Sequence, residues 1–238
     1  MEYVLFIDSG MGGATIIKSY IQKYGNINFI FHCENAYAPL GNLSKKILQK
    51  LCNKIILNYT SKYNISLIVL ACNTLTSACV KILRKNLKIN IVGVEPNIKV
   101  NGGKTLVIAT NYTIKNCEVL QSVPYNKIAL PKLSYYIDKY YPKLDKKIKG
   151  YLCKHLPIKS SFDNIILGCT HYVLAKKQIQ QIYPNANFYD SIMGTINQIN
   201  RLLNGKTVCG KEAIIVLSKP NKKLLQNVEK YIFDNNLQ

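Results

Sequence analysis

Two cysteines stand in matching sequence settings, and each is placed where a side chain could exchange a proton with a ligand. Residues 66–74 read S-L-I-V-L-A-C-N-T and contain Cys72, and residues 163–171 read D-N-I-I-L-G-C-T-H and contain Cys169. Each apolar run lacks alternation, which predicts a strand buried on both faces. The cysteine then follows the carboxyl end of its strand, the edge where open α/β sheets bind ligands. We therefore expect a site with a thiol on each side.

Three kinds of chemistry fit such a pair of thiols. A disulfide is one, but the first residues lack the basic segment and cleavage site of a signal peptide, so a cytoplasmic, reducing location is expected. A single nucleophilic cysteine is another, with His171 as a base for Cys169, but Cys72 would then have no role. The third is a pair of acid/base groups on opposite faces of one carbon, removing a proton from one face and returning one to the other.

Polar residues near the two cysteines could support that chemistry. A free thiol has a pKa of about 8.5, and a helix N-terminus or a nearby cation lowers it. Asp8 follows the first apolar run, and Asp138 is the only acid in a segment rich in tyrosine and lysine, so either carboxylate could accept or steer protons. Asn73, Thr74 and Thr170, with backbone N–H groups at helix starts, could hold an anionic substrate without arginine.

A repeated strand–turn–helix plan must position these residues. In the first half we expect strands at 3–7, 28–32, 67–71 and 89–94, and helices at 14–24, 44–62 and 72–86. In the second half we expect strands at 105–109, 128–130, 163–168, 187–189 and 214–217, and helices from 114, at 144–156, at 173–183, from 190 and at 222–233. This order predicts a doubly wound α/β pattern, with the loop at Asn101-Gly102-Gly103 as a candidate domain crossing.

The composition narrows the classes of function. The 238 residues carry a formal net charge of +20, yet only Arg84 and Arg201 are arginines, and the lysines are spread along the chain. Specific readers of nucleic acid rely on arginine forks, so we interpret the charge as compositional drift and expect no specific nucleic-acid partner. Weak, salt-sensitive contact with nucleic acid stays open. No apolar run reaches membrane-spanning length, so no membrane association is expected.

The sequence carries no recognisable cofactor or metal motif. After Gly10 and Gly12, the third glycine of a dinucleotide fingerprint would fall at Thr15, and there is no G-K-[ST] phosphate loop. The three histidines are not spaced as zinc ligands. The remaining cysteines are expected to be reduced, buried and inert: Cys33, Cys52, Cys79, Cys117, Cys153 and Cys209.

Several motifs together resemble the glutamate racemases of the cofactor-independent aspartate/glutamate racemase superfamily. Residues 8–13 match the opening D-S-G-x-G-G, residues 71–74 match A-C-N-T, and residues 167–172 match L-G-C-T-H-Y. Further matches are Ala109-Thr110 with Thr113, for the family's threonine pair, and Asp190-Ser191, for a late D-S. The similarity covers nearly the whole chain. Aspartate racemases of the superfamily typically carry glutamate where His171 stands, so the histidine favours glutamate as the substrate.

The resemblance implies two similar open-sheet α/β domains, residues 1–95 plus 190–238 and residues 96–189, with the active site in the cleft between them. It implies Cys72 and Cys169 as the acid/base residues, assisted by Asp8 and His171, without a cofactor or metal. The implied substrate-binding residues are Ser9, Pro39, Leu40, Gly41, Asn73, Thr74, Thr110, Thr113 and Thr170. The reaction would supply D-glutamate for peptidoglycan in the cytoplasm, and a homodimer is expected.

Some positions depart from the family pattern. The family's Pro-Tyr-Gly is Pro39-Leu40-Gly41, which loses an aromatic ring, and its preceding Gly-Asp is Cys33-Glu34. Asp138 stands where the family has a glutamate, and Leu75 replaces a small residue. Two alternatives therefore stay open: a racemase for aspartate or another amino acid, and a drifted, non-catalytic relative that binds amino acids or a protein partner.

Overall fold

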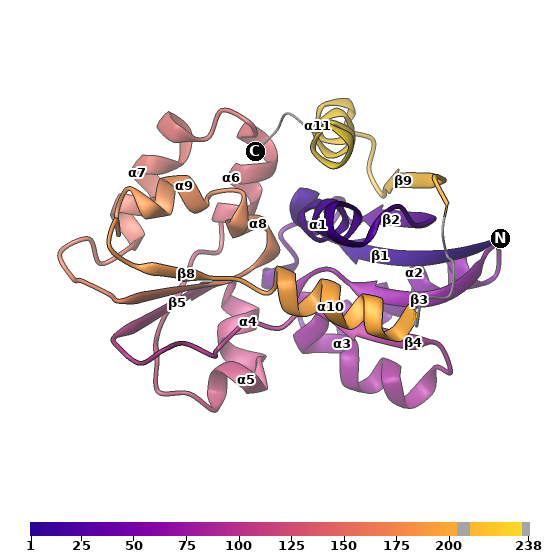
Figure 1. Cartoon of the computed structure of the whole chain (residues 1–238), viewed down its shortest axis with the longest axis horizontal. Helices are drawn as coiled ribbons and strands as arrows, with labels where there is room; N and C mark the ends of the chain where they lie inside the picture. Colours follow the sequence, from indigo (N-terminus) through magenta and orange to yellow (C-terminus); the bar gives the residue numbers. More distant parts are fainter. Residues whose placement is uncertain (204–209, 235–238) are drawn as a thin grey trace.

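Parallel strands form two separate sheets in the computed structural model, which describes residues 1–203 and 210–234 (Figure 1). The larger sheet has the order β4-β3-β1-β2-β9, and the smaller has the order β6-β5-β7-β8. Every described strand pair is parallel. The strands are β1 (Glu2–Asp8), β2 (Phe29–Cys33), β3 (Asn64–Leu70), β4 (Asn90–Gly93), β5 (Thr105–Ala109), β6 (Asn126–Ala129), β7 (Asn164–Gly168), β8 (Asn187–Tyr189) and β9 (Ala213–Leu217). The expected α/β class with two open sheets is confirmed.

Helices alternate with these strands along the chain. The α-helices are α1 (Ala14–Tyr24), α2 (Lys45–Thr60), α3 (Asn73–Asn86), α4 (Asn111–Asn116), α5 (Glu118–Gln121), α6 (Leu133–Tyr140), α7 (Asp145–His155), α8 (Thr170–Val173), α9 (Lys176–Gln180), α10 (Ile192–Leu203) and α11 (Lys222–Phe233). There are also two short 3-10 helices. The first, η1 (Met11–Gly13), follows β1, and the second, η2 (Leu40–Asn42), precedes α2. Within the described chain, no helix has the length and apolar character needed to cross a bilayer.

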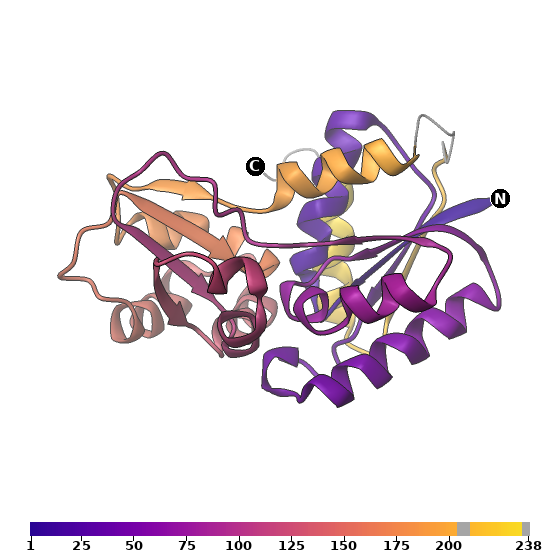
Figure 2. The ribbon, with the colours of Figure 1, turned by 90° about the horizontal axis from the view of Figure 1, so that it is seen from below.

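Both faces of the larger sheet are covered by helices, which explains why its strands are apolar without alternation. Val4 and Phe6 of β1 pack into the apolar cluster formed with α1, α10 and α11. Leu5 and Ile7 of the same strand pack into the cluster formed with α2 and α3. Figure 2 shows these helix groups on opposite sides of the larger sheet. The end of β1, where Asp8 lies, is therefore fixed from two sides.

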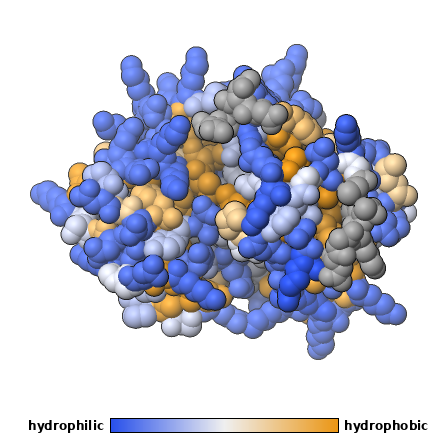
Figure 3. Space-filling model, in the orientation of Figure 1, coloured by the Kyte–Doolittle hydropathy of each residue, from blue (hydrophilic) through white to orange (hydrophobic). Residues whose placement is uncertain are grey.

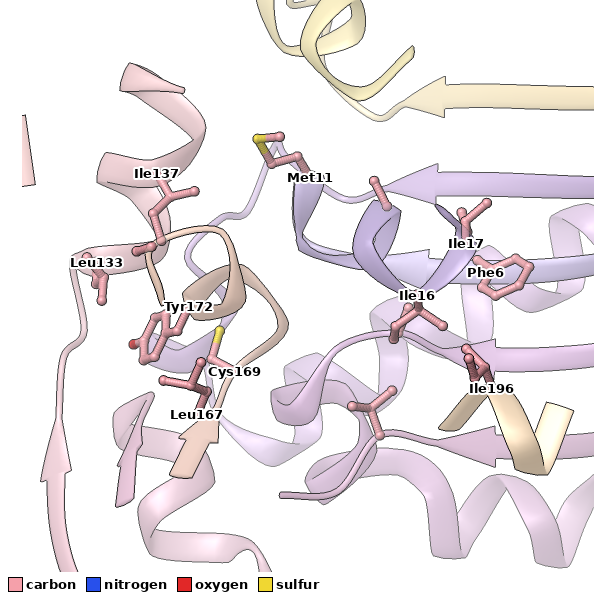
Figure 4. Close-up of a cluster of buried hydrophobic side chains, with 14 of the residues drawn as sticks. Phe6, Met11, Ile16, Ile17, Leu133, Ile137, Leu167, Cys169, Tyr172 and Ile196 are labelled. Atoms are coloured by element: carbon pink, nitrogen blue, oxygen red, sulfur yellow. The ribbon is translucent and has the colours of Figure 1, made fainter. Parts of the chain in front are cut away.

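One apolar cluster runs through both halves of the molecule. It joins Phe6 and Ile16 of the larger sheet's half to Leu167 and Tyr172 of the smaller sheet's half, with Met11 of η1 in the same cluster. Figure 4 shows these side chains along the junction between the two halves. Burial of apolar surface is the main favourable term in folding, so the junction is part of the core and not a loose contact.

The chain crosses between the two sheets twice, once between β4 and β5 and once between β8 and α10 (Figure 2). The first crossing contains the predicted loop, where Gly102 and Gly103 have positive φ angles of 68° and 81°. Side chains other than glycine rarely adopt such angles, which accounts for the glycine pair. After the second crossing, α10 contacts α1, β3 and β4. The C-terminal part of the chain therefore returns to the larger sheet, where β9 pairs with β2.

Most element boundaries agree with the sequence predictions to within a few residues. However, α6 lies in the segment rich in tyrosine and lysine where no helix was predicted, and two predicted helices differ in their bounds. The helix expected from residue 114 begins at Asn111, because the Thr110 hydroxyl accepts a hydrogen bond from the Thr113 N–H and caps α4. The helix expected at 173–183 is instead two short helices, α8 and α9. Ala175 separates them with φ −102° and ψ 11°, outside the α-helical region.

The core position of Phe6 leads to a stability prediction. Its ring is fully buried and contacts the Phe29 ring edge to face, with centroids 6.2 Å apart. The Phe6→Ala substitution should lower the free energy of unfolding by about 3–5 kcal/mol. Leu57→Ala on α2 is the control: that side chain is 63% exposed, so the change should stay within about 0.5 kcal/mol. Urea denaturation followed by circular dichroism measures both, and equal losses would contradict the packing described.

Candidate active site

The two cysteines occupy equivalent positions in the two sheets. Cys72 follows β3 and is the N-cap of α3, with φ −134° and ψ 123°. Cys169 follows β7 and is the N-cap of α8, with φ −150° and ψ 134°. Each residue is only 6% exposed. The matching sequence settings therefore fold into matching local structures, one on each side of the junction.

The electrostatic environment of Cys72 is set by its burial and by charged groups of both sheets. Burial and the negative charge of Asp8 raise the pKa of the Cys72 thiol well above its ordinary value, and the charge of Cys169 raises it further. The N–H groups of Leu75 and Thr74 at the start of α3 oppose this shift. The helix start thus lowers the pKa of Cys72, as expected, but burial and the charge of Asp8 outweigh this effect.

Asp8 at the end of β1 links the two sheets. Its Oδ1 accepts hydrogen bonds from the Ser9 N–H at 2.6 Å and from the Ser9 hydroxyl at 3.4 Å. Its Oδ2 accepts from the Gly13 N–H and, at 3.3 Å, from the Thr170 hydroxyl of the smaller sheet. Burial raises the pKa of Asp8, although the positive charge of His171 opposes the shift. Cys72 also hydrogen-bonds this carboxyl, which places a proton acceptor beside the first thiol.

His171 lies between two carboxyl groups. Its Nε2 is 3.2 Å from Asp138 Oδ1, and its Nδ1 is 3.9 Å from Asp8 Oδ2. Burial alone lowers the pKa of His171, but Asp138 and Asp8 outweigh burial and hold that pKa well above its ordinary value. A hydrogen bond to Cys169 acts in the same direction. The imidazolium therefore stands beside the second thiol, as Asp8 stands beside the first.

The Gly12 N–H lies 3.3 Å from Nε2 of the same imidazole. It can donate to that nitrogen only when Nε2 carries no proton, whereas the protonated nitrogen donates to Asp138. A side chain on Gly12 would overlap His171, Thr170 and Asp8, so glycine is required for this close approach. The glycine turn after β1 thus brings the backbone into contact with the His171 imidazole.

Hydroxyl groups form a second link between the sheets. The Thr74 hydroxyl of α3 lies 3.0 Å from the Thr110 hydroxyl at the end of β5, and Thr110 donates to the Thr113 hydroxyl at 2.9 Å. Asn73 Nδ2 donates to the Val94 carbonyl at 3.0 Å, which fixes the side chain. Its Oδ1 is buried and, among the described residues, has no hydrogen-bond partner. That oxygen can accept a hydrogen bond from a bound ligand.

The residues expected from the proline–glycine turn lie at the border of this hydroxyl network. Leu40 is 2% exposed and packs in the apolar cluster that contains Cys72 and Leu75. Gly41 faces Thr110 so closely that an added Cβ would lie 2.8 Å from the Thr110 Cβ. Pro39 is half-buried at the start of η2. Leu40 and Gly41 are therefore brought to the site, and Pro39 positions the turn that carries them.

The sequence analysis named Asp138 as a carboxylate that could steer protons, but the residues implied by the family resemblance did not include it. Besides contacting His171, its Oδ1 accepts a hydrogen bond from the Met11 N–H at 3.2 Å. A side chain on Gly10 would overlap the Asp138 carboxylate. Asp138 thus joins α6 to the turn after β1 and belongs with the candidate residues.

Sequence comparison finds relatives that match almost the whole chain. The glutamate racemase of Buchnera aphidicola subsp. Schizaphis graminum is 32% identical in an alignment that covers 97% of this chain and 96% of the relative. This chain belongs to the glutamate racemase family. The glutamate racemase of Leptospira interrogans serovar Lai is 31% identical, with 94% of this chain and 91% of the relative covered. No protein-family model matches the chain.

Solved structures of glutamate racemases have the same fold. The Escherichia coli glutamate racemase, solved with L-glutamate and the activator UDP-MurNAc-Ala, aligns with a TM-score of 0.84 and 23% identity over 97% of this chain and 95% of that chain. The Aquifex pyrophilus glutamate racemase aligns with a TM-score of 0.71 and 21% identity over 98% of this chain and 95% of that chain. These likenesses confirm the expected fold of the glutamate racemase family.

Among the remaining described cysteines, Cys33 contacts the candidate site. Its thiol donates to the Gly10 carbonyl at 3.4 Å, and burial, together with the negative charges of Asp8 and Asp138, raises its pKa well above the ordinary value. Cys33, Cys52, Cys79 and Cys117 are buried free thiols, and Cys153 is half-buried and free. Cys209 lies outside the described residues. Within 1–203 and 210–234, no group of three or more histidine, cysteine or acidic side chains is arranged to hold a metal ion.

The Asp138–His171 pair leads to a prediction about pH. Because the folded-state pKa of His171 is raised, its stabilising effect is fully present below the unfolded pKa of about 6.5 and is lost as pH rises through the folded-state value. Asp138→Asn should lower the pKa of His171 and cost about 1.5–3 kcal/mol near pH 6, with a smaller cost at higher pH. An NMR titration of the imidazole and unfolding at several pH values measure both effects.

Asp145→Asn is the matched control for this substitution, because Asp145 is an exposed acid at the start of α7 that accepts from Gln178 Nε2 at 2.7 Å. It should leave the titration of His171 unchanged. An unchanged His171 titration in Asp138→Asn would contradict the charge coupling described.

Proposed function

We propose that this protein interconverts L- and D-glutamate by a two-base proton transfer between Cys72 and Cys169. The observation that carries the proposal is the paired arrangement: each cysteine is the N-cap residue of a helix that follows a buried strand, Asp8 accompanies Cys72, and His171 accompanies Cys169. A two-base racemisation needs such a pair, with one group to take the α-proton and another to return a proton to the opposite face. Asp8 and His171 would assist as proton acceptor and donor.

The surrounding polar groups suit an amino-acid substrate. The free Oδ1 of Asn73 would accept from the ammonium group, and Ser9, Thr74, Thr110, Thr113 and Thr170 offer hydroxyl groups around the two thiols. Backbone N–H groups at the start of α3 would hold a carboxylate and stabilise charge as it develops on deprotonation. Pro39, Leu40 and Gly41 would shape the border of the substrate site. No cofactor or metal is needed for this proton transfer.

The thiols are nearly closed off, so substrate entry requires the two halves to separate. Cys72 and Cys169 are 6% exposed, and Asp8 and His171 are 0% and 1% exposed. We infer a domain division at residues 1–95 plus 190–238 and 96–189, supported by the two chain crossings, each of which joins one sheet to the other. Opening at these crossings would part the hydroxyl and carboxylate contacts between sheets. Closure would expel water and desolvate the reacting groups.

The wider role proposed here is the supply of D-glutamate for peptidoglycan in the cytoplasm, by a homodimer that acts on a small-molecule substrate. Family membership supports it. We propose neither a membrane nor a specific nucleic-acid partner.

The proposal is tested by solvent deuterium. When L-glutamate turns over in D₂O, deuterium should appear in the D-glutamate product before it appears in the remaining L-glutamate, because different thiols serve the two faces. Cys72→Ala and Cys169→Ala should each lower racemisation by about 10²–10⁴-fold. Cys153→Ala, a half-buried cysteine on α7, is the matched control and should retain activity. If neither Cys72→Ala nor Cys169→Ala changed deuterium uptake, the two-thiol mechanism would be wrong.

A racemase for aspartate is the second candidate, favoured by the apolar packing of Leu40 and Leu75 next to Cys72. One methylene group changes selectivity by about 10–200-fold, so glutamate should exceed aspartate in kcat/KM by about that factor. Loss of optical rotation across an amino-acid panel measures it, with the Cys72→Ala variant as background. A higher value for aspartate would reverse the assignment. A stable fold without turnover on any amino acid would indicate the non-catalytic relative.

A further inference from the structure

A cavity outside the candidate active site lies where α2 packs over the β2–β9 edge of the larger sheet. Its volume is about 660 Å³, within the range of small-molecule sites. Figure 2 shows α2 along one side of this sheet. Strand β2, the loop after it and one side of α2 supply the lining residues that matter here: His32, Glu34, Tyr37, Ile47, Lys50 and Lys54. None of them belongs to the residues assigned to proton transfer or substrate binding.

A buried carboxylate belongs to the sheet side of this cavity. Glu34 and His32 are 4% and 8% exposed, and Glu34 Oε2 lies 3.3 Å from His32 Nε2. The other ring nitrogen, His32 Nδ1, lies 3.0 Å from the Tyr59 hydroxyl, so the imidazole is held on both sides. Burial raises the pKa of Glu34, but His32 and Ser218 outweigh burial and hold that pKa below its ordinary value. The cavity therefore contains a negative charge shielded from water.

One oxygen of this carboxylate is unsatisfied. Glu34 Oε1 is buried and has no hydrogen-bond partner among the residues that the structure describes. The nearby Ser218 hydroxyl donates to Asn35 Oδ1 at 3.2 Å and accepts from the Ala36 N–H at 3.0 Å. A buried charged oxygen without a donor is costly, and the terminal torsion of a glutamate rotates over a broad range. A donor bound in the cavity, above all a positively charged one, can therefore satisfy Oε1.

Positive charge lies on the helix side of the cavity. Lys50 and Lys54, one helical turn apart on α2, are exposed lining residues. No described carboxylate forms an ion pair with either lysine. Charge at the surface does not by itself mark a site in this chain, because Figure 3 shows hydrophilic side chains over much of the face that carries α10 and α11. What distinguishes the cavity is that two unpaired lysines share it with a buried, unsatisfied carboxylate oxygen.

Apolar side chains also line the cavity. Ile47, Leu51 and Ile55 follow one another at four-residue spacing, which places them along one side of α2. Ile47 is 48% exposed, and Tyr37, in the loop after β2, is 56% exposed. Removing such apolar surface from water is favourable. A ligand that combines charged ends with an apolar side chain would therefore use more of this surface than a purely polar ligand.

We propose that this cavity binds a zwitterion with an apolar side chain, either a free apolar amino acid or a short apolar peptide. Its ammonium group would donate to Glu34, its carboxylate would lie on Lys50 and Lys54, and its side chain would cover Ile47 and Leu51. An amine without a carboxylate would leave the lysines unused, and a carboxylate without an ammonium group would leave the glutamate oxygen unsatisfied. Glu34 also stands where the family pattern has an aspartate, so its carboxylate extends one methylene further from the backbone. The proposal does not rest on the proposed function.

Isothermal titration calorimetry on the full chain tests the binding, with L-leucine, L-leucyl-L-leucine, N-acetyl-L-leucine, 3-methylbutylamine and glycine as probes. L-leucine or the dipeptide should bind about tenfold or more tightly than the acetylated acid, the amine or glycine, because each of these lacks one of the three groups. Tighter binding of the dipeptide would support the site and assign it to peptides, and tighter binding of leucine would support it and assign it to amino acids. Binding by neither, or equal binding of N-acetyl-L-leucine, would overturn the proposal.

Lysines on α2 provide matched variants with the same change in charge. The double variant Lys50→Ala with Lys54→Ala should weaken leucine binding by about tenfold. The double variant Lys45→Ala with Lys46→Ala alters two exposed lysines of the same helix that do not line this cavity, and it should change binding by less than about twofold. Equal effects would indicate general charge attraction and overturn the site.

The glutamate is tested in the same way. Glu34→Gln keeps the shape of the side chain but removes its charge, so it should weaken leucine binding by about tenfold. Glu229→Gln, at an exposed acid of α11, is the matched control and should leave binding unchanged. Circular dichroism checks the fold of each variant, and the lysine variants, whose side chains are exposed, test the site independently if Glu34→Gln fails to fold.

Nuclear magnetic resonance locates the bound ligand without any measurement of turnover. In ¹⁵N-labelled protein, leucine should shift the amide signals of Tyr37 and Lys50 and leave those of Thr74 and Thr170 in place. Shifts confined to Thr74 and Thr170 would place leucine in the candidate active site and overturn the proposal. An inactive chain that binds leucine at Tyr37 and Lys50 would contradict the proposed function and leave this site supported.

Discussion

The arrangement depends on a carboxylate buried where the two sheets meet. Asp8 is fully buried at the end of β1, and its two oxygens take hydrogen bonds from Ser9, Gly13 and Thr170. A buried charge is costly unless it is paired and hydrogen-bonded, so these donors must stay in place. Since Thr170 comes from the smaller sheet, separating the sheets would break this contact to Asp8. Opening of the site and its electrostatics are therefore linked.

The two buried thiols have different neighbours. A carboxyl group faces Cys72, and an imidazole with a raised pKa faces Cys169. In a low-dielectric site, such neighbours act far more strongly than in water. A proton taken up near one thiol and another released near the other would keep the total charge constant. In the proposed mechanism, proton transfer in either direction would therefore add no net charge to the interior of the site.

Much of this arrangement could be predicted from the sequence, because it depends on local patterns. The runs before Cys72 and Cys169 are buried strands, and each cysteine caps a helix, as their apolar residues indicated. Contacts between distant segments were harder to predict. The raised pKa of Cys72 comes mainly from burial and Asp8, which outweigh the helix start. Likewise, the break at Ala175 depends on local backbone geometry that the apolar periodicity does not reveal.

The aspartate at 138 shows how the fold accommodates a departure from the family pattern. An aspartate reaches one methylene less far than the family's glutamate, yet Asp138 Oδ1 lies 3.2 Å from His171 Nε2. The approach is made by the backbone: Gly10 comes so close that any side chain there would overlap the carboxylate, and the Met11 N–H donates to it. Asp138 therefore reaches His171 because the glycine turn and α6 lie against each other. The distance between the carboxylate at position 138 and His171 therefore depends both on the length of the side chain and on the packing of α6.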